Sequence, residues 1–412
     1  MSVFYQRTTL NSICEFIVDC EHKTAPLQDE GYPSIRTPNI GRGRLILDGV
    51  NRVSEDTYRQ WTQRAVPQPG DLILAREAPV GNVAIIPRNL KVCLGQRTVL
   101  IRPDKSKVDG NYLVYLLLGD EVRGKIHSLT AGATVAHLNM REIREMELPQ
   151  LPPLPTQRKI AAILSAYDDL IENNTRRIKI LEEMAQAIYR EWFVHFRFPG
   201  HESVRMVESE LGLIPEGWEV KNLFEIAEVT YGFPFKSNLF TSNPTNKPVI
   251  RIRNIPNDYT DNFTNETVSE KFQVKNGDLL IGMDGDFHMG KWAGGIAYLN
   301  QRIVRLRPKI EISPYYLFLA LQKPIHFFGS TITGTTVAHL SDKDLKSINL
   351  MIPGKIFIKK INENLDFLFK FEILLKIKNA NLRRTRDLLL PKLISGELDV
   401  SELDITIPEE NT

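Results

Sequence analysis

An internal repeat constrains this 412-residue chain more than any other feature of its sequence. Short blocks of the first half recur in the same order in the second half, at offsets that drift from 215 to 202 residues. The paired blocks are PSIRTPNI (33–40) with PVIRIRNI (248–255), GDLIL (70–74) with GDLLI (277–281), QRTVLIRP (96–103) with QRIVRLRP (301–308), and Gly132, Ala133 and TVAHL ending at Leu138 with Gly334, Thr335 and TVAHL ending at Leu340. Repetition in a fixed order indicates a duplicated structural unit. A long amphipathic stretch follows each series, so the predicted unit is a domain followed by a helix.

The first long stretch covers residues 156–196 and contains neither Gly nor Pro. Its apolar residues recur at steps of seven, which is typical of a helix with a coiled-coil seam. The seam comprises Ile160, Tyr167, Asn174, Leu181 and Ile188, with Ile163, Leu170, Met184, Leu164, Ile171, Ile178 and Ala185 beside it. Forty helical residues would extend about 60 Å. Such a rod needs a partner to cover its apolar stripe.

The second stretch, residues 356–393, supplies a partner of similar length within the same chain. Its seam comprises Ile361, Leu368, Leu375, Leu382 and Leu389, flanked by Ile358 and Leu365 and then by the polar residues Glu372, Asn379 and Arg386. The alternative is two unrelated core helices, but globular helices rarely keep seven-residue spacing over such a length. We therefore expect the two helices to pair.

Charge and composition exclude several classes of protein. The net charge of +2 argues against a purely electrostatic nucleic-acid binder. Residues 355–392 carry ten basic and four acidic side chains, whereas residues 397–410 carry six acidic and no basic ones. The first ten residues do not resemble a signal peptide, and no run of 18 apolar residues occurs, so a soluble cytoplasmic protein is expected. Three cysteines, Cys14, Cys20 and Cys93, are too few for a disulfide framework and are expected to be free thiols.

Short β-prone runs dominate both repeats and predict an α+β fold with curved, mostly antiparallel sheets. The runs are LILDG, DLILA, NVAIIP and TVLIRP in the first copy, and DLLIG, GIAYL and RIVRLRP in the second; helices are expected at 111–118 and 314–321. The predicted organisation is a first domain at 1–150, a long helix at 151–198, a linker at 199–213, a second domain at 214–352, a long helix at 353–396 and an acidic tail at 397–412.

The sequence contains no complete catalytic or metal-binding motif of the kinds considered below. GDFHMGK at 285–291 has the Gly and Lys spacing of a phosphate loop, but Trp292 stands where a Mg²⁺-binding Ser or Thr is required. The eight histidines show no zinc-binding spacing, so no metal site is expected. His137 and His339 recur in both copies, and a hydrogen-bonded structural role is favoured over a catalytic one.

Polar residues repeated in both copies favour a protein that reads a polymer. Arg, Asn and Gln present paired donors and acceptors that match base edges and also bind phosphates. The repeated residues are Arg36, Asn39, Gln96 and Arg97 in the first copy, and Arg251, Asn254, Gln301 and Arg302 in the second. The same side chains could instead hold loops in place, and both interpretations stay open here.

The order of domain, long helix, domain, long helix resembles the specificity subunit of a Type I restriction-modification system. The resemblance covers the whole chain and is carried by LPPLPTQRKIAAIL (151–164), IPEGWEV (214–220), both TVAHL blocks and LLLPKLISGEL (388–398). It implies two target-recognition domains, each reading one half of a split site in double-stranded DNA, joined by an antiparallel helix pair. It further implies a subunit without catalytic activity or cofactor of its own. Two modification subunits would methylate adenine with S-adenosylmethionine, and restriction subunits would cut DNA with ATP and Mg²⁺.

If the two domains read different half-sites, shared residues should hold the scaffold or phosphates, and unlike residues should read bases. Candidate base readers are Arg76 and Glu77 opposite Met283 and Asp284, together with Arg42, Arg44, His288 and Lys291; Arg253 is a further DNA-binding candidate. A coiled-coil scaffold that binds only proteins is the main alternative. A nuclease or methyltransferase is a third, disfavoured because its motifs are missing.

Overall fold

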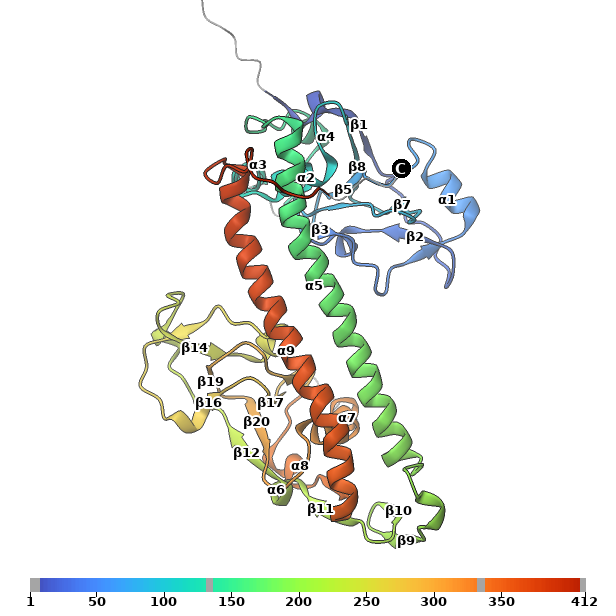
Figure 1. The fold of residues 1–412 in the computed structure, drawn as a ribbon, viewed down its shortest axis with the longest axis vertical. Coiled ribbons are helices and arrows are strands. Elements are labelled where there is room, and N and C mark those ends of the chain that lie inside the picture. Colours follow the sequence, from blue (N-terminus) through green and yellow to red (C-terminus); the bar gives the residue numbers. More distant parts are fainter. Residues whose placement is uncertain (1–7, 131–135, 332–337, 408–412) are drawn as a thin grey trace, which may run out of the picture. The chain divides into compact units, whose positions relative to one another are not determined.

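The computed structural model describes residues 8–130, 136–331 and 338–407 (Figure 1). The chain divides into two compact units, unit 1 comprising Met1–Asp169 with Arg383–Thr412 and unit 2 comprising Leu170–Leu382. Each unit holds one repeat and part of both long helices. The predicted mixed α+β class is confirmed, and most strand pairs are antiparallel.

Unit 1 contains a five-stranded sheet in the order β1-β8-β5-β6-β3, in which only β3 and β6 pair in parallel. The strands are β1 (Cys14–Asp19), β3 (Gly43–Arg44), β5 (Leu72–Ala75), β6 (Val83–Ile85) and β8 (Thr98–Pro103), and a second sheet pairs β4 (Arg52–Val53), β2 (Tyr32–Ile35) and β7 (Cys93–Leu94). Strand β5 is buried on both faces. Leu72 and Leu74 enter one core and Ile73 the other, because successive side chains alternate across a sheet.

Helices α2 (Gly110–Leu118), α3 (Asp120–Thr130) and α4 (Met140–Arg144) cover one face of the five-stranded sheet. Helix α1 (Glu55–Trp61) packs on the second sheet instead, beside β7, and 3₁₀ turns lie at Leu10–Ile13 and Thr37–Asn39. Helix α2 confirms the prediction for 111–118, and Asp109 caps it by accepting from Tyr112 N–H. The predicted strand at LILDG is wrong. Ile46 and Leu47 are exposed, and Ile46 N–H donates to Asn39 O in a turn that leaves only one isolated bridge at Leu45.

Unit 2 repeats the main sheet in the order β12-β20-β17-β18. Its strands are β12 (Ala227–Tyr231), β17 (Leu279–Gly282), β18 (Met289–Lys291) and β20 (Ile303–Pro308), and a second sheet contains β13 (Phe240–Thr241), β15 (Phe263–Thr264), β14 (Lys247–Ile250), β19 (Ala297–Leu299) and β16 (Gln273–Val274). Leu279 and Ile281 enter the helix-side core and Leu280 the opposite one, as in β5. The duplication inferred from sequence therefore extends to side-chain orientation.

Two small pairings complete unit 2. Strand β11 (Glu219–Asn222) pairs with β21 (Asn349–Ile352), and the segment predicted as a linker contains a hairpin of β9 (Met206–Ser209) and β10 (Gly212–Pro215). The helices are α6 (Leu223–Ile226), α7 (Pro314–Thr331) and α8 (Asp342–Lys346), with 3₁₀ turns at His201–Ser203, Ser237–Leu239, Ile252–Asn257 and Glu270–Phe272. Helix α7 is longer than the predicted 314–321.

The two long helices are α5 (Leu154–Tyr189) and α9 (Lys355–Ile394), drawn in green and red in Figure 1. Pro152 and Pro153 precede α5, and Pro155 lies in its first turn, where a missing N–H costs little. Helix α5 ends in a π-helical turn at Arg190–Val194, so it is shorter than the predicted 151–198. Among the described residues, no helix combines the length and apolarity needed to span a membrane.

The helices pair in opposite directions. Within unit 2, Asn174 bonds Asn379, and eight residues further along α5 Glu182 shares a lysine with Glu372, which lies seven residues earlier on α9. Ile160, Leu181, Leu368 and Leu375 are buried as predicted. Leu170 and Met184 are exposed, so their assignment to the seam is wrong. Leu164 and Ala185 are fully buried, so the row four residues after the seam faces inward, and the row three residues after it, which holds Leu170 and Met184, faces outward.

Candidate nucleic-acid interface

A cluster of a carboxylate, a histidine and an arginine lies at the end of β5 in unit 1. Glu77 Oε1 accepts from His137 Nδ1 at 2.7 Å, and Glu77 Oε2 lies 2.9 Å from Arg97 Nε. Arg76 Nη2 lies 3.0 Å from His137 Nε2. Since a guanidinium can only donate, Nε2 accepts and the ring proton lies on Nδ1, facing Glu77.

The corresponding cluster in unit 2 lies at the end of β17. Asp284 Oδ1 accepts from His339 Nδ1 at 2.7 Å, Arg302 Nη1 lies 3.3 Å from the imidazole, and Arg302 Nε lies 3.7 Å from Asp284 Oδ2. Both arginines extend into solvent, with exposed side-chain fractions of 60% for Arg97 and 54% for Arg302. The two units therefore present the same three functional groups.

The same main-chain bonds build both clusters. In unit 1, Arg76 N–H donates to Arg97 O and Leu138 N–H donates to Arg76 O. In unit 2, Met283 N–H donates to Arg302 O and Leu340 N–H donates to Met283 O. These bonds bring together three segments that are far apart in the sequence: the end of the GDLIL strand, the QR turn and the end of TVAHL. The preceding residues of the TVAHL blocks, 131–135 and 332–337, lie outside the described residues.

This grouping was not predicted, because Glu77 and Asp284 differ in residue type and were interpreted as unlike residues that read bases. The structure corrects that interpretation, since both are carboxylates that bond a histidine and pair with an arginine. A signal was present in the sequence: Glu77 and Asp284 both stand seven residues after the glycine of the repeated GDL block.

Arg76 was predicted to read bases, and its environment contradicts that role. Its side chain is buried, with Nε donating to Leu138 O at 2.8 Å and Nη1 pairing with Asp19 Oδ2 at 2.6 Å. Met283 takes the matching place in unit 2 and is also buried. The buried side chain of Arg76 therefore supports the cluster from inside the domain and does not face a ligand.

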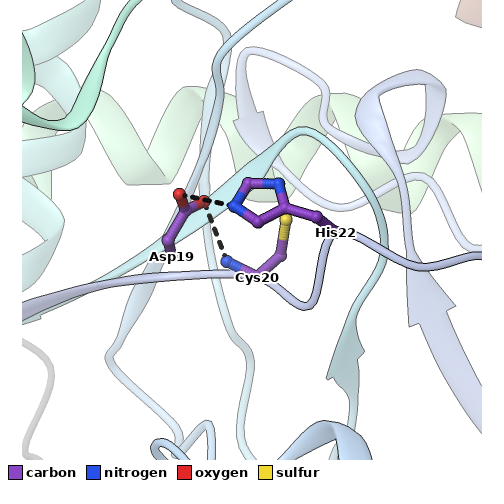
Figure 2. A group of neighbouring side chains, drawn as sticks. All are labelled: Asp19, Cys20 and His22. Carbon is purple, nitrogen blue, oxygen red and sulfur yellow. Dashed lines mark hydrogen bonds and ion pairs between the residues drawn. The ribbon is translucent and has the colours of Figure 1, made fainter.

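Asp19, Cys20 and His22 place three potential metal-ligand atoms within 4.8 Å of one another (Figure 2). Asp19 accepts from the Cys20 main-chain N–H and pairs with His22 Nε2 at 3.1 Å, as well as with Arg76. Burial raises the pKa of the Cys20 thiol, which opposes the thiolate that a metal would require. A guanidinium already neutralises the carboxylate, so these groups fit a support for Arg76 better than a metal site.

The repeated asparagines hold turns. Asn39 Oδ1 accepts from Arg36 N–H at 3.1 Å, and Asn254 Oδ1 accepts from Arg251 N–H at 2.8 Å. Arg36 is exposed, whereas the Arg251 guanidinium lies 4.5 Å from the centroid of Phe240. Of the two interpretations left open by the sequence, the scaffold role fits both asparagines.

Lys291 was predicted to read bases from an exposed loop, and that prediction is wrong. Its side chain is only 4% exposed because it ends β18 inside the unit 2 core. Its ammonium group lies 2.8 Å from Glu372 Oε2 on α9 and 3.0 Å from Glu182 Oε1 on α5. The lysine ties the recognition sheet to both long helices.

The other predicted residues are mostly exposed. Arg42, Gln301, Arg253 and the half-exposed His288 reach solvent, and Gln96 is partly buried beside His22 O. Partial burial and, to a smaller extent, the nearby Arg123 lower the pKa of Arg42. Arg44 pairs with Asp169 on α5 and so joins the sheet to the helix.

The two similar domains thus each expose a guanidinium group that could bind an anion, Arg97 in unit 1 and Arg302 in unit 2. A family model described as "Type I restriction modification DNA specificity domain" matches residues 5–183 and 215–384, covering both repeats. The chain belongs to this family of Type I specificity subunits. The specificity subunit thus contains two target-recognition domains, as its duplicated sheets and clusters indicate.

Known relatives agree with this assignment. The specificity subunit is 27% identical over 369 residues to the Type I restriction enzyme MjaIX specificity subunit of Methanocaldococcus jannaschii, covering 87% of this chain and 84% of the relative. It is 23% identical over 371 residues to the HindI specificity subunit of Haemophilus influenzae, covering 73% and 80%. The crystal structure of a Type I S subunit from M. genitalium shares the fold, with a TM-score of 0.59 at 17% identity over 95% of this chain and 98% of that one.

Proposed function

We propose that each target-recognition domain reads one half of a bipartite site in double-stranded DNA, and that the chain itself performs no catalysis. The observation that carries this proposal is the repeated exposed arginine cluster on two domains of the same fold. A protein with two similar readers and different surrounding loops is suited to two different half-sites. Shared residues then contact the DNA backbone, and exposed unlike residues, Arg42 in unit 1 and Arg253 and His288 in unit 2, contact bases.

The helix pair sets the spacing between the half-sites in this proposal. Buried polar contacts oppose sliding of one helix along the other, because a shift would leave their donors without partners. Asn174 Nδ2 donates to Asn379 Oδ1 at 2.9 Å in unit 2. In unit 1, Asp168 on α5 pairs with Arg386 on α9 and accepts from Tyr115 Oη at 2.7 Å.

The exposed face of α9 is the proposed docking surface for modification subunits. Phe367 and Leu374 are exposed although apolar, and Phe371 stacks on Phe367 with ring centroids 6.0 Å apart. Their spacing of four and three residues places them on one stripe of the helix. A partner helix would remove this stripe from water. S-adenosylmethionine, ATP and Mg²⁺ would be bound by the modification and restriction subunits, and the complex would act in the cytoplasm.

Methylated adenines provide the test of function. Sequencing them in a host with and without this gene should show one class of methylated site that depends on the gene, with two defined blocks separated by a fixed spacer. A protein-binding scaffold would change no methylation pattern. Loss of methylation from unrelated sites would also contradict the proposal.

A further inference from the structure

Arg97 and Arg302 have a backbone conformation that their side chains do not favour. Their φ angles are 66° and 70°, in the left-handed region that glycine and asparagine occupy most easily. An ordinary side chain there costs about 1 kcal/mol or more. Both repeats nevertheless place an arginine at this turn, directly before β8 and β20.

Stability does not explain these arginines. The contacts of Arg97 with Glu77 and of Arg302 with Asp284 involve guanidinium groups that are more than half exposed. Exposed ion pairs contribute about 0–1 kcal/mol, which at most offsets the conformational cost. A glycine would form the same turn without strain, so the guanidinium group itself must serve a purpose.

The geometry suits an anion. Glu77 binds Arg97 through Nε, which leaves the two terminal nitrogens directed away from that contact. Arg302 is held at two points: its Nε lies 3.7 Å from Asp284 Oδ2 and its Nη1 lies 3.3 Å from the His339 imidazole, which leaves Nη2 and one Nη1 hydrogen for a ligand. A guanidinium fixed on one edge presents its remaining N–H groups as a pre-oriented fork, the arrangement that binds phosphate oxygens in pairs.

We propose that Arg97 and Arg302 each bind one backbone phosphate of DNA, at matched positions of the two half-sites. The inference rests on the proposed function and assigns to the clusters a role in affinity, not in sequence choice. The residues following Glu77 and Asp284 differ completely between the repeats, whereas the arginine, the carboxylate and the histidine are retained. A group that read bases would be expected to diverge with its loop. A phosphate is present at every sequence and requires no such change.

Glycine substitutions separate the phosphate role from a structural one. The complex of the chain with its host's modification subunit is prepared as wild type, Arg97→Gly, Arg302→Gly and the double variant. Equilibrium binding is measured from low to moderate salt on two duplexes, one carrying the methylated site and one with scrambled sequence. Each substitution should weaken binding to both duplexes by the same factor. It should also reduce the slope of log K against log salt by about 0.9.

Thermal unfolding supplies the second readout. Since glycine relieves the left-handed strain, each variant should unfold at the same temperature as wild type or above it. Asn89→Gly is a matched control because Asn89 is exposed and has a φ of 62° without a charge. Arg59→Ala is the charge control, since Arg59 is exposed on α1 and pairs with Glu55 one turn away on the same helix. Neither control should alter the salt slope.

Each other outcome overturns the inference. Lower unfolding temperatures with an unchanged salt slope would make the arginines structural, and weaker binding confined to the cognate duplex would make them base readers. If wild type bound both duplexes equally and left no split methylation motif, the proposed function would fail. The salt slopes of the variants would still decide the phosphate contacts separately.

Discussion

The buried ion pair of Lys291 with Glu372 makes Lys291 a structural residue of unit 2. Glu372 is 0% exposed and Lys291 4% exposed, and Lys376 on α9 also lies near Glu372 and Asp258. The sequence could not predict this placement. GDFHMGK has the composition of an exposed loop, and the two acids that bury the lysine lie 109 and 81 residues away from it. Local composition carries no information about such distant partners.

Replacing Lys291 by methionine should strongly destabilise unit 2. The substitution keeps an unbranched side chain that is one atom shorter but leaves Glu372 buried without its main counter-ion, at a cost of about 3–5 kcal/mol. The measurement is the thermal unfolding midpoint, which should fall by several degrees.

The double variant Lys291→Met with Glu372→Gln is the control for this prediction. It removes both charges, so much of the lost stability should return. If Lys291→Met alone unfolded like wild type, the buried ion pair would contribute nothing and Lys291 would again be free for another role.

At the scale of elements, the long helices were predicted well because their signal is periodic and continuous. Helix α9 occupies Lys355–Ile394 against a predicted 353–396. The clusters were not predicted, since they depend on three strand ends and turns meeting in space. LILDG was misassigned for a related reason: Ile46 and Leu47 are β-prone residues, but their side chains remain exposed in the folded unit.

The asparagine pair should determine helix register at a cost in stability. Replacing both Asn174 and Asn379 by leucine should raise the unfolding midpoint, because a buried polar pair becomes an apolar contact. The single variant Asn379→Leu should instead cost about 1–3 kcal/mol by leaving the Asn174 amide unsatisfied.

Spacer choice is the second readout for the asparagines. The double-leucine variant should bind sites with the spacer lengthened or shortened by one base pair better than wild type does, relative to the native spacer. Unchanged spacer preference together with higher stability would show that the pair does not set register.

Two aspartate substitutions on α9 test the inner and outer faces of the same helix. Leu375 is buried in the unit 2 core, so Leu375→Asp should destabilise the protein by several kcal/mol and lower DNA affinity without changing the preferred half-sites. Phe367 is 64% exposed, so Phe367→Asp should leave unfolding unchanged but weaken binding to the modification subunit.

Calorimetry of the isolated chain and titration with the modification subunit measure the two effects. If Phe367→Asp bound its partner as tightly as wild type, the docking surface would lie elsewhere. If Leu375→Asp left the unfolding midpoint unchanged, the seam would not hold the helices together.

At the scale of the whole molecule, the duplication determined most of what could be predicted. Repeated blocks revealed two equivalent domains, and the alternation of Leu279, Leu280 and Ile281 follows that of Leu72, Ile73 and Leu74. Function within each domain was harder to infer. Sorting matched positions of the two repeats by residue identity placed Glu77 and Asp284 among the unlike residues, although both carry a carboxylate.

Independent reading by two domains predicts separable effects of substitution. Arg42→Ala should relax preference in one half-site only, and His288→Ala in the other half-site only, each by about 1–3 kcal/mol at the affected base pair. Binding to duplexes with each base pair changed in turn measures this. Effects of one substitution on both halves would contradict independent domains.

Enrichment from random DNA would show whether one chain reads two separated half-sites. The wild-type complex is incubated with random duplexes, and the retained fraction is sequenced. We expect two short conserved blocks separated by unspecified base pairs of constant number. A single contiguous block, or no enrichment at all, would contradict this expectation.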